Sequence, residues 1–245
     1  MYIIEGNIGS GKSTFLKILK SHIPGITTEF EPISSWKTTD YGQELLEKFY
    51  QHPKRWAYTL ESLTMMNRVR DYQTHHQTKN PNIFTERSIY SGHHCFAQNS
   101  HASGFMTTIE WQMYSQLFSF LILNTCKAPL GFIYLKVDPA IAYERIQKRN
   151  RPEENNITRT YIDQIHERHE SFLINEKNVL PHIGITPVLT LDCDEEFESN
   201  PIKLHEHITK VKQFIASTQN KFIAAKPDWQ MLRRAPTIDD ELYNI

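Results

Sequence analysis

The sequence predicts an α/β protein with five parallel strands and helices on both faces of the sheet. Short apolar runs typical of buried strands alternate with longer segments of helical periodicity along most of the chain. A glycine-rich loop follows the first apolar run directly, and charged residues follow several of the later runs. Parallel sheets covered on both faces have this alternation, and their ligands lie at the carboxyl ends of the strands.

The glycine-rich loop is the most specific motif. Gly6, Gly11, Lys12 and Ser13 satisfy the G-x-x-x-x-G-K-[ST] pattern, with a strand before it and a helix after it. Backbone N–H groups in such a loop and the helix N-terminus attract phosphate oxygens. We therefore expect a P-loop NTPase-type fold in which Lys12 contacts the β- and γ-phosphates and Ser13 holds Mg²⁺. The expected phosphate-binding residues are Gly6, Asn7, Ile8, Gly9, Ser10, Gly11, Lys12, Ser13 and Thr14.

The other elements follow from periodicity and from helix and strand breakers. Strands are predicted at 2–4, 26–30, 82–85, 132–137 and 188–191. Helices are predicted from 15 onward and at 43–50, 53–76, 107–124, 140–148, 161–177 and 204–217, with a charged loop at 149–156. We expect one P-loop domain at 1–217 and a C-terminal tail at 218–245 whose order the sequence does not decide.

Composition excludes several classes of protein. The chain has 245 residues, 39% of them hydrophobic, and a net charge of -1, so no general attraction to nucleic acid is expected. Its three cysteines are far apart, which favours neither a disulfide framework nor a zinc site. The first strand begins at residue 2 and no apolar run could span a bilayer, so we expect a cytoplasmic protein without membrane association.

Charged residues follow the predicted strands at positions that the topology brings together. Glu31 follows the second strand, and Glu86 with Arg87 follows the third. Arg149 and Arg151 follow the helix after the fourth strand. Because the carboxyl ends of parallel strands meet at one edge of the sheet, we expect acids and cations around one crevice.

These segments together resemble the deoxynucleoside kinase family, which includes deoxycytidine, deoxyguanosine and mitochondrial thymidine kinases and the insect multisubstrate enzyme. The resemblance covers roughly residues 1–195. The matching segments are 6–14, Glu31-Pro32 with Trp36, Tyr50 before Pro53 and Trp56, 86–91 with Phe96, 143–146, Arg149, Arg151, Glu153-Glu154 and Leu191-Asp192.

The resemblance implies an ATP-dependent kinase acting on the 5′-hydroxyl of deoxynucleosides. Glu31 would take the proton from that hydroxyl, and Arg87 would orient Glu31. Glu86 would lie near the Mg²⁺ ion, although an ordinary strand-end ion pair is the alternative for this residue. Arg149 and Arg151 would form a basic lid over the transferring phosphoryl group, whereas a solvated basic loop is the alternative.

The resemblance also implies a substrate pocket. Tyr50 and Glu154 would hold the sugar 3′-hydroxyl and leave little space for a 2′-hydroxyl. Trp36 and Phe96 would flank the base, although by periodicity alone such aromatic residues more often belong to the core.

The base-reading position departs from the family pattern. Glu61 stands where the family usually has glutamine, and Arg68 lies two turns later on the same helix face. The aspartate that accompanies this arginine in relatives corresponds to Gly92, so Glu61 is the nearest acidic partner by spacing. A Glu61–Arg68 pair, with space for a purine at Gly92, favours deoxyguanosine or a broad purine range, with thymidine next. Alternatively, the two charges neutralise each other and shape selects the base.

Two other functions remain as alternatives. A nucleoside monophosphate kinase would share the loop and lid but would need further cations for its acceptor phosphate, which Glu31 would repel. A P-loop switch protein would carry Asn-Lys-x-Asp and Asp-x-x-Gly, and neither pattern occurs in the sequence. We also expect a homodimer, because the helix at 107–124 has more apolar residues than one core-facing stripe needs.

Overall fold

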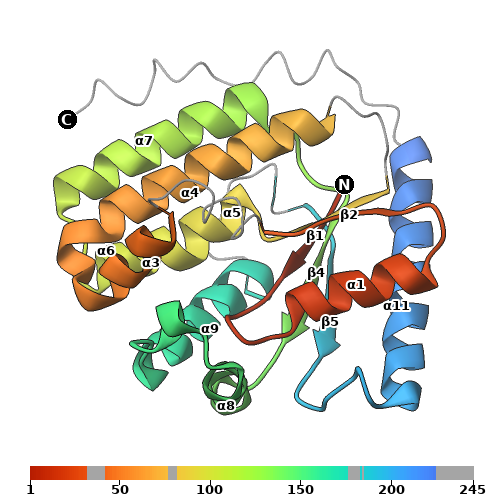
Figure 1. Ribbon diagram of the computed structural model, residues 1–245. Helices are drawn as coiled ribbons and strands as arrows, with labels where there is room; N and C mark the ends of the chain where they lie inside the picture. The colour runs from red at the N-terminus through yellow and green to blue at the C-terminus, as the bar shows by residue number, and fades with distance from the viewer. Residues whose placement is uncertain (32–41, 77–81, 176–182, 184, 225–245) are drawn as a thin grey trace.

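The protein is a five-stranded parallel sheet with helices on both faces, as seen in a computed structural model that describes residues 1–31, 42–76, 82–175, 183 and 185–224 (Figure 1). The strand order is β2-β3-β1-β4-β5, and all four pairings are parallel. The strands are β1 (Tyr2–Glu5), β2 (Thr27–Glu29), β3 (Ile83–Glu86), β4 (Gly131–Lys136) and β5 (Val188–Asp192). The predicted fold class is confirmed, and no strand end is shifted by more than one residue.

The predicted helices occur in the predicted order, and the structure adds two features. The helices are α1 (Lys12–His22), α3 (Gly42–Gln51), α4 (Pro53–His76), α5 (Ile89–Ser91), α6 (Gln98–Ala102), α7 (Thr108–Thr125), α8 (Pro139–Arg149), α9 (Arg159–Leu173) and α11 (Pro201–Ala224). No element was predicted between β3 and α7, but this segment contains α5, a π-helical stretch at Gly92–Ala97 and α6. The charged loop after α8 includes one 3₁₀ turn at Pro152–Glu154.

Two helices have C-terminal ends four or more residues away from the predicted positions. Helix α9 stops at Leu173 instead of 177, where the N–H groups of Ile174 and Asn175 both donate to the Glu170 carbonyl. Helix α11 continues to Ala224 instead of 217. Its Thr218 hydroxyl lies 2.7 Å from the Tyr2 hydroxyl on β1, so a residue assigned to the tail packs against the sheet.

Each face of the sheet has its own hydrophobic core, because successive side chains of a strand point to opposite faces. On one face Ile3, Phe132 and Tyr134 pack with buried residues of α3, α4, α7 and the end of α9. On the other face Tyr2 and Ile4 pack with buried residues of α1, α8 and α11. Figure 1 shows the sheet between these two groups of helices. The carboxyl ends of the strands are thereby held in fixed register beside the loop that follows β1.

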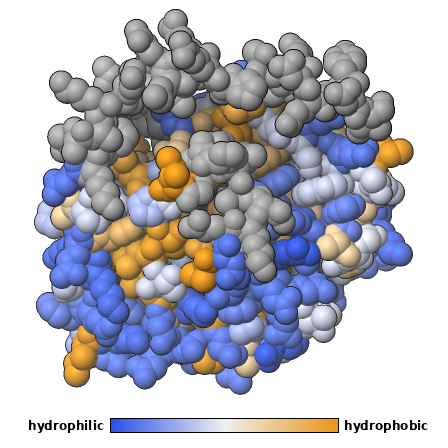
Figure 2. All heavy atoms as spheres, turned by 180° about the vertical axis from the view of Figure 1, so that it is seen from behind, coloured by the Kyte–Doolittle hydropathy of each residue, from blue (hydrophilic) through white to orange (hydrophobic). Residues whose placement is uncertain are grey.

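Helix α7 has apolar residues on two sides. Tyr114, Phe118 and Ile122 are buried against the core. Five large hydrophobic side chains of the same helix are exposed by 39–69%: Ile109, Met113, Leu117, Phe120 and Leu123. The face of the molecule in Figure 2 is mainly hydrophilic, with one area where hydrophobic residues gather. Among the described residues, no helix has the length and hydrophobicity that crossing a bilayer requires.

Candidate active site

The phosphate loop joins β1 to α1 at the carboxyl edge of the sheet. Gly9 and Gly11 adopt positive φ angles of 82° and 88°, which residues with a side chain adopt only with strain. A Cβ atom at Gly9 would also lie 2.4 Å from the Ala142 carbonyl oxygen. The Asn7 side chain ties the loop to α9 by donating to the Ile162 carbonyl at 2.9 Å. The sequence therefore needs glycine here both for the turn and for close packing.

Lys12 points back into this loop. Its Nζ donates to the carbonyl oxygens of Gly6 at 3.2 Å and Asn7 at 2.8 Å. Burial, followed by the nearby charge of Arg87, lowers the pKa of Lys12 to about 7. A phosphate group placed in the loop would supply the negative charge that stabilises the ammonium form.

Ser13 and Glu86 lie side by side, as the sequence predicted for a metal site. The Ser13 hydroxyl is 3.0 Å and 2.9 Å from the two carboxylate oxygens of Glu86. Both groups offer oxygen ligands, the type that Mg²⁺ prefers. The residues that are present fit a magnesium ion next to the phosphate loop.

The carboxylate of Glu31 is held between two arginines. Arg87 Nε donates to Oε2 at 3.1 Å, and Arg68 Nη2 donates to Oε1 at 2.7 Å. The Glu31 side chain is 10% exposed, and burial alone would raise its pKa. The charges of Arg87 and Arg68 outweigh burial, so the pKa of Glu31 is lower than the ordinary value. Glu31 is therefore ionised at neutral pH.

Arg87 adopts a strained backbone conformation. Its φ angle is 62°, in the left-handed region that costs a residue with a side chain about 1–2 kcal/mol. Its N–H donates to the Ile4 carbonyl at 3.0 Å, and its Nη1 donates to the Gly6 carbonyl at 3.2 Å. The guanidinium also lies 4.6 Å from the centroid of the Phe96 ring. These contacts offset the strain and fix Arg87 between the phosphate loop and Glu31.

One cavity collects most of the predicted site. Among the predicted residues, it is lined by Ile8, Gly9, Lys12, Ser13, Glu31, Tyr50, Glu61, Arg68, Glu86, Arg87, Phe96, Arg149, Arg151 and Glu154. The lining also includes Leu46, Phe49, Leu60, Thr64 and Tyr161, which the sequence analysis did not single out. Thr64 lies one helical turn from both Leu60 and Arg68, so its position on this face was predictable. Tyr161, by contrast, reaches the cavity from α9 without any local signal. Trp36 lies outside the residues that the structure describes.

Glu61 faces the cavity in an unusual state for a carboxyl group. It is 4% exposed, and burial raises its pKa to about 8 although the charge of Arg68 opposes this. No ion pair of Glu61 is found within the described part of the chain. Glu61 is therefore mainly neutral at pH 7, and a neutral carboxyl has one donor and one acceptor.

The expected Glu61–Arg68 pair is not formed, because Arg68 binds Glu31 instead. Gly92 does not leave space for a purine either. A Cβ atom at Gly92 would lie 2.5 Å from Arg68 Nη1, so the guanidinium already occupies that space. Neither the Glu61–Arg68 pair nor the free space at Gly92 is found in the described residues, so the predicted preference for guanine has no support from them.

The two lid arginines converge on Glu154. Arg149 makes contacts of 2.6–3.1 Å with both oxygens of Glu154, and Arg151 Nη1 is 3.7 Å from Oε1. Tyr50 packs against Phe49 and Tyr161, with ring centroids 5.2 Å and 6.0 Å apart. These side chains line the same cavity as the phosphate-loop residues.

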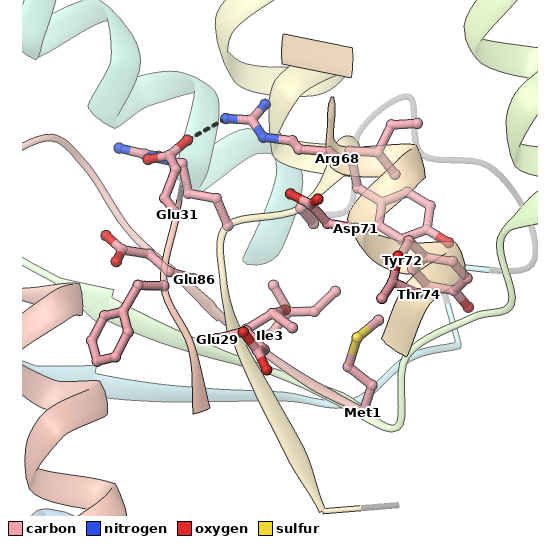
Figure 3. A pocket seen from close by; sticks show the side chains of 15 residues that line it. Met1, Ile3, Glu29, Glu31, Arg68, Asp71, Tyr72, Thr74 and Glu86 are labelled. Atoms are coloured by element: carbon pink, nitrogen blue, oxygen red, sulfur yellow. Dashed lines mark hydrogen bonds and ion pairs between the residues drawn. The ribbon is translucent and has the colours of Figure 1, made fainter. Parts of the chain in front are cut away.

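A second cavity, of about 210 Å³, borders the first. Figure 3 shows its lining, with the Glu31–Arg68 bond above Glu29, Asp71 and Met1. Glu31, Arg68, Glu86 and Arg87 line both cavities. The ion pairs of Glu31 are thus part of the wall between them.

Comparisons with known proteins show the family of this chain. The sequence profile of the family described as "Deoxynucleoside kinase" matches residues 2–216. The chain is 34% identical over 239 residues to deoxycytidine kinase 2 of Gallus gallus, covering 87% of this chain and 89% of that protein. It is 33% identical over 213 residues to a probable deoxycytidine kinase of Fowlpox virus, covering 87% of each. It is 32% identical over 235 residues to the mitochondrial deoxyguanosine kinase of Xenopus laevis, covering 87% and 88%. The chain belongs to the deoxynucleoside kinase family and is a nucleoside-phosphorylating, ATP-binding transferase of nucleotide salvage.

Proposed function

We propose that this enzyme transfers the γ-phosphoryl group of ATP to the 5′-hydroxyl of deoxyribonucleosides and releases deoxynucleoside monophosphates. The observation that carries the proposal is the ionised Glu31 carboxylate in the cavity that also contains Lys12 and Ser13. Such a carboxylate can accept the proton of a neutral hydroxyl as the phosphoryl group leaves ATP. It would repel an acceptor that already carries a phosphate, which argues against a nucleoside monophosphate kinase.

The other charged residues divide the phosphoryl-transfer work. The phosphate loop from Gly6 to Thr14 binds the β- and γ-phosphates, and Lys12 neutralises their charge. Ser13 and Glu86 would hold Mg²⁺, directly or through water, and the ion would supply positive charge beside the phosphate oxygens. Arg149 and Arg151 exchange part of their contact with Glu154 for the transferring group, which requires mainly positioning and neutralisation.

The nucleoside occupies the part of the cavity opposite the loop. Tyr50 and Glu154 bind the 3′-hydroxyl and crowd the 2′ position, so deoxyribose is preferred over ribose. Phe96 packs against the base, and Trp36 is expected on its other side. Neutral Glu61 can donate one hydrogen bond and accept another, which suits the adjacent donor and acceptor on every nucleobase edge. We therefore infer a broad base range that includes guanine and thymine, without the guanine preference inferred from a Glu61–Arg68 pair.

The test is a phosphorylation assay with ATP, Mg²⁺ and each deoxynucleoside, ribonucleoside or deoxynucleoside monophosphate. We expect turnover with deoxynucleosides, a loss of about 100-fold or more in Glu31→Gln, and no turnover in Lys12→Ala. The matched controls are Glu206→Gln and Lys20→Ala, since both residues lie on exposed helix surfaces. Phosphorylation of monophosphates but not of nucleosides would reject the proposal, as would unchanged turnover in Glu31→Gln.

A further inference from the structure

We propose that Arg68 is a positioning residue that holds the Glu31 carboxylate for the reaction, and that Gly92 provides the space this requires. The inference deepens the proposed function and rests on the role of Glu31 as the base. Arg68 then supports proton transfer through Glu31, whereas the sequence predicted that it contacts the nucleobase.

The first argument is the geometry around Glu31. Each oxygen of the carboxylate has its own guanidinium donor, at 2.7 Å from Arg68 and 3.1 Å from Arg87. The three side chains are 10%, 12% and 6% exposed in the order Glu31, Arg68, Arg87. Charge-assisted hydrogen bonds in such a buried site are short and strongly directional. With both oxygens bound, rotation of the carboxylate breaks at least one of these bonds, whereas Arg87 alone would fix only one oxygen.

The Arg68 guanidinium occupies the space that a side chain at Gly92 would fill. Gly92 has φ -52°, a right-handed helical angle that any residue adopts, so its backbone conformation does not require glycine. A Cβ atom there would lie 2.5 Å from Arg68 Nη1 and 3.7 Å from Cζ. The absence of a side chain at Gly92 therefore allows the guanidinium to reach its position beside Glu31.

The remaining atoms of Arg68 do not favour a role at the base edge. Its Nη2 bonds Glu31, its Nη1 lies against Gly92, and its Nε is buried without a hydrogen-bond partner in the described residues. Glu61, the neighbour expected by spacing, forms no ion pair with Arg68 in the described chain. A contact of Nη2 with the nucleobase would have to replace the 2.7 Å ion pair with Glu31 and would release the carboxylate that accepts the proton.

Arg68 also affects the proton affinity of Glu31, which makes its role measurable. Together with Arg87 it lowers the pKa of Glu31 against the opposing effect of burial. Because only ionised Glu31 accepts a proton, the acid limb of the profile of kcat/KM against pH reports this pKa. Loss of Arg68 raises the pKa, so the limb moves to higher pH.

Other groups around Glu31 titrate or carry charge as well. They are Glu5 on β1, Lys12 in the loop, Glu29 on β2, Tyr50 on α3, Glu61 and Asp71 on α4, Glu86 and Arg87 at the end of β3, Tyr161 on α9, and Arg149, Arg151 and Glu154 in the lid. None of them is substituted in the Arg68 and Gly92 variants. A difference between the variant and wild-type profiles therefore isolates the contribution of Arg68.

The experiment compares Arg68→Met, Gly92→Ala and the double variant with wild type. Gly92→Ala suits its helical backbone and displaces only the flexible end of Arg68, so circular dichroism and the melting temperature should stay near wild type. For Arg68→Met we expect kcat to fall about 10- to 100-fold and the KM for deoxynucleosides to change little. The acid limb of the kcat/KM profile should shift to a pH about one unit higher. Gly92→Ala should give the same changes to a smaller degree.

The double variant tests whether both residues act through one contact. If they do, Gly92→Ala has no further effect in the Arg68→Met background. Additive losses, or an unchanged acid limb in Arg68→Met, would overturn the proposal. The proposal would also be overturned if Arg68→Met kept the wild-type kcat but changed KM or the ranking of the four nucleobases, because Arg68 would then bind the nucleobase. Failure of the proposed function itself looks different, since wild type would then phosphorylate no deoxynucleoside.

Discussion

Glu61 is expected to bind the nucleobase as a neutral carboxylic acid, and Glu61→Gln should therefore remove a pH dependence from substrate binding. The side chain is 4% exposed and lines the substrate cavity. Burial raises its pKa to about 8, and the charge of Arg68 only partly opposes this. Glutamine has the same shape as the protonated carboxyl and keeps one donor and one acceptor at every pH.

The magnitude follows from the pKa. At pH 7 about ten neutral carboxyls exist for each ionised one, and at pH 9 the ratio is reversed. Ionisation removes the donor and leaves an acceptor of the base unpaired, which costs about 1–3 kcal/mol. We therefore expect kcat/KM for a deoxynucleoside to fall about 10-fold between pH 7 and pH 9 in wild type.

The assay measures kcat/KM from pH 6 to pH 9.5 for wild type and Glu61→Gln. Lys12 has a pKa lowered to about 7 and titrates in the same range, so the ratio of the two enzymes is the informative quantity. Lys12 affects both enzymes equally, whereas Glu61 affects wild type alone. If the two profiles fall in parallel above pH 7, Glu61 does not act as a donor and the argument is refuted.

The same pKa shift has a consequence for folding stability. In the unfolded chain Glu61 loses its proton near pH 4.5, but in the folded chain it keeps the proton up to about pH 8. The folding stability that protonated Glu61 contributes is therefore fully present below pH 4.5 and is lost as the pH rises towards 8. Relative to Glu61→Gln, wild type should lose up to about 1.4 kcal/mol of unfolding free energy per pH unit in this window. Urea unfolding at pH 5, 6.5 and 8 measures this difference, and a constant difference would contradict it.

Three further predictions concern other parts of the molecule. Tyr50→Phe should raise the KM for deoxynucleosides several-fold and reduce the ratio of kcat/KM between a deoxynucleoside and its ribonucleoside counterpart. Steady-state kinetics would show neither change if Tyr50 does not contact the sugar. The exposed apolar residues of α7 should form a homodimer interface, so light scattering should give twice 28.8 kDa for wild type and the monomer mass for Phe120→Glu, whereas a monomeric wild type rejects the dimer. Thr218→Val should destabilise the fold by about 1 kcal/mol, because the Tyr2 hydroxyl loses its 2.7 Å hydrogen bond and keeps the longer contact of 3.4 Å with the Ile215 carbonyl. Unchanged unfolding of Thr218→Val would show that the Thr218 contact is dispensable.

The fold and the phosphate loop could be predicted because their signals are local. The loop motif lies within nine residues, and strands of a parallel sheet carry continuous apolar runs that the sequence shows directly. The convergence of Glu31, Glu86 and Arg87 followed from topology, since parallel strands end at one edge. The π-helical stretch at Gly92–Ala97 had no comparable signal, because its aromatic and histidine residues show no clean period.

The pairing of Arg68 could not be predicted from spacing. On α4, Glu61 is the nearer acid in sequence, yet Arg68 binds Glu31, which is 37 residues away. The choice depends on burial and on Gly92, which are tertiary features. It also depends on charge, because a neutral Glu61 attracts a guanidinium less strongly than the ionised Glu31 does.

The cavity thus holds two glutamates in opposite protonation states, and each state fits a different task. Glu31 is kept ionised by two arginines, as a residue that accepts a proton must be. Glu61 is kept neutral by burial, as a residue that offers both a donor and an acceptor must be. Arg68 bonds Glu31 and stabilises its charge, whereas it forms no ion pair with Glu61, and its charge alone does not overcome the effect of burial there. Environments that give two groups of the same kind different pKa values are characteristic of acid–base sites, and here the difference depends on the ion pair between Arg68 and Glu31.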